Sequence, residues 1–215
     1  MKKKFSVLLA VFVLLLSFAA CKGSDKTDGK NDSNPDTSLL TNTSEGLLSG
    51  EYKVEIEIED YGIIALTLDA DNAPVSVTNF INLVKDGFYN GLTFHRVYAG
   101  FMIQGGDPKG NGTGGSERNI QGEFSINGIE NNLSHTRGVI SMARRGDPYY
   151  DSASSQFFIV HKDSTSLDGS YAAFGWVTSG IEIVDSICEN TPVIDSNGSV
   201  LPKNQPVIKE IRVVE

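Results

Sequence analysis

A change of character at residue 51 divides the chain and limits what each part can form. Beyond it, residues 52–59 and 64–68 alternate between apolar and polar side chains, with a glycine-containing break between the two runs. A period of two puts alternate side chains on opposite faces of a strand, so the pattern predicts a hairpin with one buried face. Residues 22–50 contain no aromatic residue, valine or isoleucine. Such a stretch buries too little apolar surface to offset its chain entropy and is predicted to be a flexible tether.

The rest of the chain consists mostly of short apolar runs separated by glycine-rich turns. These runs predict strands over residues 93–97, 101–104, 138–143, 156–161, 172–177 and 207–213. Residues 74–86 and 181–189 instead carry apolar side chains at helical spacing, and Pro74 is acceptable in a first helical turn. Many short strands and only two helices indicate a mainly β fold, and this pattern leaves both a barrel and a sandwich open.

The first twenty residues have the organisation of an export signal. Residues 2–4 are lysines, and the uncharged run that follows ends at Ala20 and is shorter than the ~20 residues that a membrane span needs. The run leads into Cys21 through Phe18 and two alanines, which resembles a bacterial lipobox with Phe18 in place of the usual aliphatic residue. An ordinary signal peptide is the alternative. We expect lipidation at Cys21, with the chain anchored to the bacterial cell membrane and its domain outside the cytoplasm.

Charge and cysteine content exclude several classes of function. The formal net charge is -9, and a chain this acidic repels phosphate, so we expect no nucleic-acid partner. If Cys21 is lipidated, Cys188 has no partner for a disulfide within the chain. The three histidines, His95, His135 and His161, show no metal-ligand spacing, and we expect neither a metal nor another cofactor.

Several motifs follow one another in a fixed order through the second part of the chain. They are FHRV at 94–97, GFMIQGGD at 100–107, NGTGG at 111–115, GVISMA at 138–143, SQFFI at 155–159, LDG at 167–169 and FG at 174–175. In this order and spacing, residues 51–215 resemble a cyclophilin-type peptidyl-prolyl cis-trans isomerase. The resemblance implies an eight-stranded antiparallel β-barrel capped by two α-helices, with a substrate groove on the outside of the barrel.

The resemblance also implies which residues form the site. The catalytic set is Arg96, Phe101, Gln104 and Phe158, and the substrate-binding set is Met102, Ala143, Arg144, Gln156, Leu167 and Tyr171. In this family the arginine donates to the proline imide nitrogen, a glutamine orients it, and apolar side chains form a slot for the proline ring. Tyr171 stands where many members carry histidine. Rotation about an X–Pro bond breaks no covalent bond, so the reaction needs no nucleophile and no metal.

Two departures from the family pattern bear on specificity. Ser166 occupies a position where cyclosporin-sensitive members carry tryptophan, so we expect weak cyclosporin binding. The segment over residues 144–155 is about three residues longer than in the short eukaryotic form and flanks the groove. We therefore expect substrate preference to differ while the isomerase residues stay intact.

These observations favour a membrane-tethered isomerase that assists the folding of exported, proline-containing polypeptides, with a monomer as the default state. A membrane-tethered peptide-binding chaperone or surface module with incidental catalysis is the alternative. The retention of Arg96 with its pocket argues against it, because a pure binder has no need for the arginine. A solute-binding lipoprotein shares the signal and the tether, but it would need a larger domain with two lobes.

Overall fold

An antiparallel sheet of eight strands dominates the computed structural model, which describes residues 39–214. The predicted export signal, Cys21 and the predicted tether as far as residue 38 lie outside the described residues. The strands are β1 (Glu51–Ile58), β2 (Gly62–Asp69), β3 (Phe94–Tyr98), β4 (Met102–Gly105), β5 (Val139–Met142), β6 (Phe157–Val160), β7 (Ala173–Ser179) and β8 (Ile208–Val214). The predicted hairpin is β1 and β2, and each further predicted strand is present with its ends shifted by one or two residues.

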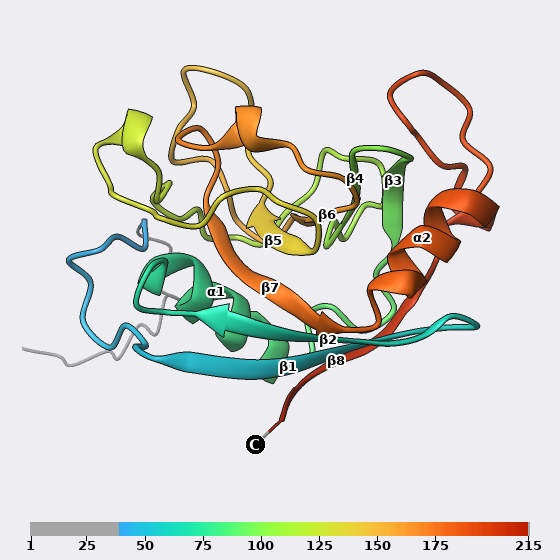
Figure 1. The fold of residues 1–215 in the computed structure, drawn as a ribbon. Coiled ribbons are helices and arrows are strands. Elements are labelled where there is room, and N and C mark those ends of the chain that lie inside the picture. The colour runs from blue at the N-terminus through green and yellow to red at the C-terminus, as the bar shows by residue number, and fades with distance from the viewer. Residues whose placement is uncertain (1–38, 215) are drawn as a thin grey trace, which may run out of the picture. The chain divides into compact units, whose positions relative to one another are not determined.

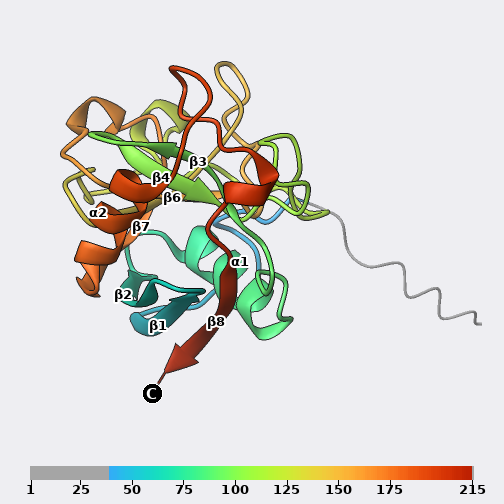
Figure 2. The same ribbon diagram turned by 90° about the vertical axis from the view of Figure 1, so that its right-hand side faces the viewer.

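The strand order β3-β4-β6-β5-β7-β2-β1-β8 makes a curled sheet whose two edges approach each other. Figure 1 shows β1, β2 and β8 below and β3 to β6 above, and Figure 2 shows the same arrangement from the side. The edges meet through an isolated bridge between Thr93 and Val207, and Phe94 N–H donates to the carbonyl of Pro206. The predicted eight-stranded antiparallel fold with two helices is confirmed.

Side chains fill both faces of the middle strands, which explains why β5 and β6 read as continuous apolar runs. Phe157 and Ile159 of β6 join the main core inside the curled sheet, where the ring of Phe157 packs edge-on against Phe80. Phe158 and Val160, on the opposite face, belong to a second, smaller apolar cluster. The fold therefore carries an apolar cluster on the outside of its sheet, and a site can be built on it.

Two helices cover the curled sheet. The helix α1 (Pro74–Lys85) begins at the predicted proline and buries its apolar face, and its first turn is capped from a distant segment. Glu123, which is fully buried, accepts hydrogen bonds from the N–H groups of Val75 and Ser76, both at 2.8 Å. This carboxylate takes up N–H groups that have no partner within the helix and lies at its positive end. The second helix is α2 (Ile181–Asn190). None of the described helices is long and apolar enough to cross a membrane.

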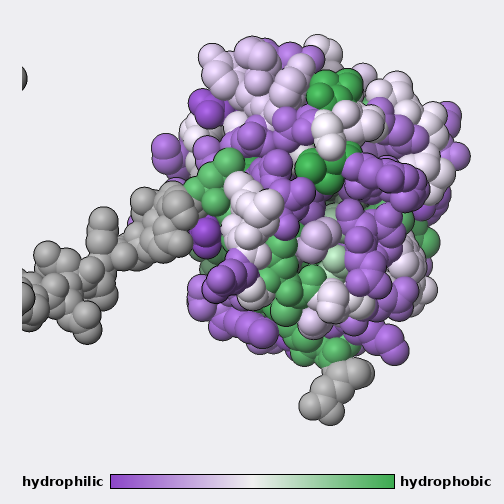
Figure 3. Space-filling model, turned by 90° about the vertical axis from the view of Figure 1, so that its left-hand side faces the viewer, coloured by the Kyte–Doolittle hydropathy of each residue, from purple (hydrophilic) through white to green (hydrophobic). Residues whose placement is uncertain are grey.

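Residues 39–50 pack on the domain, which differs from the prediction that the flexible tether extends to residue 50. Leu40 is buried and pairs with Ile120, and its backbone exchanges hydrogen bonds with Asn119 and Gln121. Leu47 and Leu48 also pack against the core. The side of the molecule that carries this segment shows hydrophobic surface in small patches among hydrophilic residues (Figure 3). The folded domain therefore extends beyond its predicted start at residue 51 and includes Leu40.

Candidate active site

The candidate site lies along one row of positions that crosses four neighbouring strands. Arg96 of β3 is paired with Gln104 of β4, Gln104 with Phe158 of β6, and Phe158 with Ser141 of β5. Residues directly opposite each other in an antiparallel pair point to the same face. The hydrogen-bonded ladder of the sheet therefore fixes the order of these four side chains on the outer face.

The predicted apolar side chains line one pocket of about 320 Å³ in this outer face. Its lining comprises Arg96, Phe101, Met102, Gln104, Ala143, Arg144, Phe158, Leu167 and Tyr171, which are nine of the ten predicted catalytic and substrate-binding residues. Phe158 and Met102 are buried at its floor, and Phe101, Leu167 and Tyr171 are half-buried around it. A small apolar ring fits a slot of this composition. We call this space the proline pocket, after the ring that the family resemblance places in it.

A chain of hydrogen bonds runs from Arg96 along the edge of the proline pocket. The Nη1 group of Arg96 donates to Oε1 of Gln104 at 3.2 Å, and Nε2 of Gln104 donates to Oε1 of Gln156 at 2.9 Å. The Nε group of Arg96 donates to the carbonyl of Asn197 at 2.7 Å. Within residues 39–214, the Nη2 group has no hydrogen-bond acceptor. Two fixed bonds thus orient the guanidinium, and one pair of donors stays available beside the pocket.

Gln156 completes this chain on a glycine-rich loop. Its Nε2 group donates to the carbonyls of Gly114 at 2.7 Å and of Gly112 at 3.2 Å. It also lines a second, polar hollow of about 540 Å³ that shares Gln104, Ala143 and Arg144 with the proline pocket. We call this space the polar hollow.

The buried carboxylate of Asp107 organises the glycine-rich loop. It accepts hydrogen bonds from the backbone N–H groups of Lys109, Asn111 and Gly112, at 2.8, 3.1 and 2.6 Å. Burial raises the pKa of Asp107, but the backbone N–H donors outweigh it and hold the pKa below its ordinary value. A Cβ at Gly114 would collide with this carboxylate, so the loop requires glycine there.

Arg144 lies beside the proline pocket as predicted, but its guanidinium is engaged by the protein itself. The side chain is 4% exposed, and it donates to the carbonyl of Ser170 at 2.8 Å and to Asp147 at 2.9 Å. The guanidinium also stacks over the rings of Tyr171 and Tyr150, at 4.7 and 5.4 Å from the ring centroids. These contacts attach the 144–155 segment, the gold loop that rises above β5 in Figure 1, to the pocket wall.

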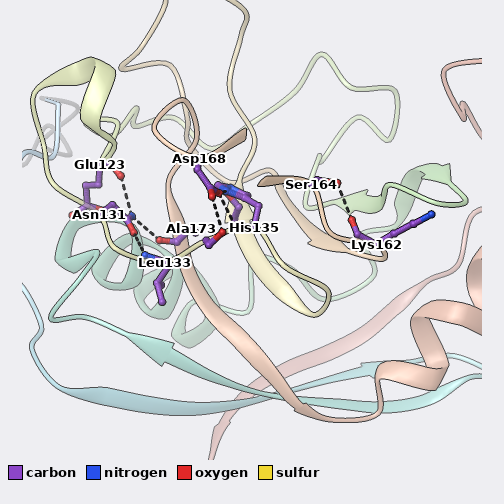
Figure 4. A network of polar contacts seen from close by, with 10 residues as sticks. Glu123, Asn131, Leu133, His135, Lys162, Ser164, Asp168 and Ala173 are labelled. Carbon is purple, nitrogen blue, oxygen red and sulfur yellow. Dashed lines mark hydrogen bonds and ion pairs between the residues drawn. The ribbon is translucent and has the colours of Figure 1, made fainter. Parts of the chain in front are cut away.

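His135, which is buried, links the exposed carboxylate of Asp168 to the buried hydroxyl of Ser141 (Figure 4). His135 Nδ1 is 2.7 Å from Asp168, and its Nε2 is 3.0 Å from Ser141 Oγ. Burial holds the pKa of His135 below its usual value in spite of the nearby carboxylate, so the ring is neutral at pH 7. The ring stacks on Phe158 with 6.0 Å between centroids. Ser141 is fully buried, so this serine, histidine and aspartate support the pocket floor and expose no nucleophile.

Sequence reasoning missed the parts of the site that depend on backbone atoms and distant contacts. The carbonyl of Asn197, which holds Arg96, lies 101 residues away along the chain. The carbonyls that anchor Gln156 belong to the loop with the NGTGG motif, and the motif by itself did not reveal this contact. The motif containing Asp168 was recognised, but its bonds to His135 have no local signal. His95, which precedes Arg96 in the chain, is buried.

The described residues include no group of three or more histidine, cysteine, aspartate or glutamate side chains that could hold a metal ion.

The outer face of the sheet offers an apolar pocket, an oriented guanidinium with free donors, and a polar hollow next to them. Such a surface can bind an extended chain and stabilise charge or a localised lone pair.

Comparison with known proteins identifies the family. A family model described as cyclophilin type peptidyl-prolyl cis-trans isomerase/CLD matches residues 53–213. Peptidyl-prolyl cis-trans isomerase B of Bacillus subtilis is 42% identical over 156 residues, which cover 73% of this chain and 94% of that protein. A peptidyl-prolyl cis-trans isomerase of Helicobacter pylori is 48% identical over 128 residues, which cover 59% of this chain and 74% of that protein.

Solved structures agree with the sequence comparison. A cyclophilin-type isomerase of Cryptosporidium parvum superposes with a TM-score of 0.68 and 32% identity, covering 77% of this chain and 99% of that one. Its structure in the presence of the dipeptide Ala-Pro gives a TM-score of 0.66 and 31% identity, with coverage of 76% and 99%. The chain belongs to the cyclophilin-type peptidyl-prolyl cis-trans isomerases.

Proposed function

We propose that Arg96 is the group that lowers the barrier to rotation about the X–Pro bond in this isomerase. The barrier is about 20 kcal/mol because the imide nitrogen shares its lone pair with the carbonyl. When the bond twists, the lone pair localises on nitrogen and becomes a hydrogen-bond acceptor. A donor from Arg96 then gains a partner that the planar ground state lacks, so the contact stabilises the transition state selectively.

The observation that carries this proposal is the double attachment of the Arg96 guanidinium. Bonds to Gln104 and Asn197 fix its plane at the edge of the proline pocket and leave Nη2 without an acceptor in the described chain. A donor that is already oriented loses little side-chain entropy when it meets the twisted imide. Phe101 and Phe158, with Met102 and Leu167, would hold the proline ring while the preceding carbonyl turns.

Arg96→Ala tests this role. We expect kcat/KM on a short Ala-Pro-Phe peptide to fall at least a hundredfold, or roughly 2.7 kcal/mol at ~1.36 kcal/mol per decade. NMR exchange measures the rate, and thermal unfolding checks that the fold is intact. Arg212→Ala is a matched control, because Arg212 is paired with Glu55 and Glu57 and lines neither the proline pocket nor the polar hollow. Near-normal activity of Arg96→Ala would contradict the assigned role.

We further propose that this isomerase is a lipoprotein that assists the folding of exported proteins. Support comes from the basic and apolar start of the chain, the small residues before Cys21, and the polar stretch that follows. Exported chains emerge unfolded, and X–Pro isomerisation takes tens of seconds without a catalyst, so it limits the folding of some of them. An isomerase anchored outside the cytoplasm would act where these chains fold.

Labelling with palmitate in cells tests the anchor. The unmodified chain is expected to incorporate the label and to sediment with membranes, whereas Cys21→Ala should do neither. Cys188→Ala is the matched control, because Cys188 is a half-buried free thiol whose pKa burial raises to about 11, and it should leave labelling unchanged. Label on the Cys21→Ala protein would contradict the proposed anchor.

A further inference from the structure

The polar hollow next to the proline pocket has walls of a distinct composition. Glycine, serine, threonine, asparagine and glutamine supply most of its lining, and no aspartate or glutamate of the described chain lines it. The charged side chains in its lining are Arg144 and Arg145. A carboxylate that entered this space would therefore meet polar groups and positive charge, with no lining carboxylate to repel it.

Arg144 does not hold this positive charge free for a ligand. Its guanidinium is almost fully buried, is paired with Asp147, and donates to the carbonyls of Ser170 and Arg145. Its role is to fasten the 144–155 segment to the wall of the proline pocket, so the chain next to it is held in place.

Arg145 is the arginine of the hollow that forms no ion pair within the described residues. Its guanidinium lies 4.8 Å from the ring centroid of Tyr149, and within residues 39–214 it has no hydrogen-bond acceptor or ion pair. Its backbone is fixed, because its N–H donates to Ser152 Oγ at 3.0 Å and that hydroxyl donates to the carbonyl of Tyr149 at 2.6 Å. The side chain is exposed, as is the Tyr149 ring beside it, but the backbone of both residues is held by Ser152, and Arg145 lines the hollow.

The carboxylates of the same segment are occupied elsewhere. Asp147 is paired with Arg144, and Asp151 accepts hydrogen bonds from the N–H of Gly122 and the amide of Asn127, at 2.9 and 2.7 Å. Neither forms an ion pair with Arg145. Among residues 39–214, the rim of the polar hollow therefore keeps one positive charge without an ion-pair partner, although the chain as a whole is acidic.

We propose that the polar hollow selects substrates with an acidic side chain close to the isomerised proline, and that Arg145 supplies this selectivity. The proposal rests on the proposed function, because it assumes that the proline occupies the neighbouring pocket. The two spaces share Gln104, Ala143 and Arg144, so one extended peptide reaches both. Each extended residue advances about 3.3 Å, so a side chain two residues from the proline is the first to test.

The size of the effect follows from exposure. A solvent-exposed ion pair contributes little, and a preference of about threefold for an acidic over a matched neutral side chain is expected. The preference should shrink as ionic strength rises, because exposed charges are screened by salt.

The test uses the full chain in detergent and peptides with blocked ends. One pair places glutamate or glutamine two positions before the proline, and a second pair places them two positions after it. NMR exchange gives kcat/KM for each peptide, and the readout is the glutamate-to-glutamine ratio within one variant, so a general change in turnover cancels. Arg145→Gln removes the proposed charge, and Lys85→Gln also removes one positive charge, at an exposed site on α1 that lines neither space.

We expect a ratio near three for at least one peptide pair with the unmodified protein and with Lys85→Gln, and a ratio near one with Arg145→Gln. A ratio near one for both pairs with the unmodified protein, or a preference that survives in Arg145→Gln, would overturn the proposal. Failure of the unmodified protein to turn over the glutamine peptides would instead contradict the proposed function, so the two failures are distinguishable.

Discussion

The proline pocket and the polar hollow are neighbours that share three residues, yet they are built in opposite ways. Strands β3, β4 and β6 supply the centre of the pocket, where cross-strand pairing fixes Arg96, Gln104 and Phe158 in one row. Loops supply most of the hollow, and single side chains such as Asp107 and Arg144 hold those loops in place. The difference separates the chemistry from the selectivity. A loop can change in length or charge without moving the row that acts on the imide.

A change in the row should affect every substrate alike, and Gln104→Ala is the sharpest case. It removes the acceptor for Arg96 and the donor for Gln156 together. We expect kcat/KM to fall about thirtyfold, or about 2 kcal/mol at ~1.36 kcal/mol per decade, on neutral and acidic peptides equally. Arg212→Ala, outside both spaces, is again the control. A loss of kcat/KM confined to acidic peptides would show that Gln104 acts in substrate selection at the polar hollow and not in orienting Arg96.

A change beneath the hollow should appear first as lost stability, and Asp107→Asn tests this. Charge-assisted hydrogen bonds are worth ~1.5–3 kcal/mol, and asparagine keeps one acceptor, so we expect a loss of about 1.5 kcal/mol at pH 7. Urea unfolding measures it.

The same variant has a defined pH dependence. The pKa of Asp107 is lowered in the folded state, so its stabilising contribution is present above the ordinary aspartate pKa, about 3.9. The contribution is lost as pH falls through the lower, folded value. The difference between the unmodified chain and Asp107→Asn should therefore be full at pH 7 and shrink below about pH 4. A difference that grows in acid would contradict the hydrogen-bonded, ionised carboxylate.

The strands that carry the catalytic row (Arg96, Gln104 and Phe158) could be predicted from sequence, because alternation and motifs are local features of the chain. Period-two alternation located β1 and β2, and the motif residues of the row fell where β3, β4 and β6 present them. The positions of the loops around the polar hollow depend on contacts between residues that are far apart in the sequence. The Nε group of Arg144 donates to the carbonyl of Ser170, 26 residues away, and the sequence around Arg144 gives no sign of this contact or of the burial of its side chain.

The N-terminal boundary of the folded domain was also not predictable from local sequence. Composition averaged over residues 22–50 predicted a tether, and the average concealed two leucine pairs, at 39–40 and 47–48. Leu40 is buried because Ile120 lies beside it, and nothing in the surrounding polar sequence reports that partner. Burial of one side chain is decided by tertiary contacts, which a composition count does not contain.

This packed segment offers a way to perturb the hollow from outside. The N–H of Leu40 donates to the carbonyl of Asn119, which lines the hollow. A chain starting at residue 51 should be less stable than one starting at residue 39 by about 1.2 kcal/mol, since the net stability of a folded domain is roughly 0.1 kcal/mol per residue and the lost segment is twelve residues long. Urea unfolding of both chains measures the difference. Equal stabilities would show that residues 39–50 contribute no net energy.

The smallest expected effect concerns cyclosporin and the rim of the proline pocket. Ser166 lies exposed on the 3-10 turn η2 (Thr165–Leu167), next to Leu167 of the pocket lining. Family members that cyclosporin inhibits tightly carry an indole at this position, and serine offers little contact area, so we expect weak inhibition of the unmodified protein. A buried aromatic side chain contributes ~150–250 Å² at ~25 cal/mol per Å², but an exposed edge contact realises only part of this.

Ser166→Trp should therefore strengthen cyclosporin inhibition about fivefold, which corresponds to about 1 kcal/mol. Because Ser166 lies outside both the catalytic row and the polar hollow, turnover of neutral peptides and the glutamate-to-glutamine ratio should stay as in the unmodified protein. A changed ratio would mean that the pocket rim and the hollow are coupled and would break the separation drawn between them. Nanomolar inhibition of the unmodified protein would show that other contacts replace the indole, and the 144–155 segment is the first place to look, because Arg144 holds it against the pocket wall.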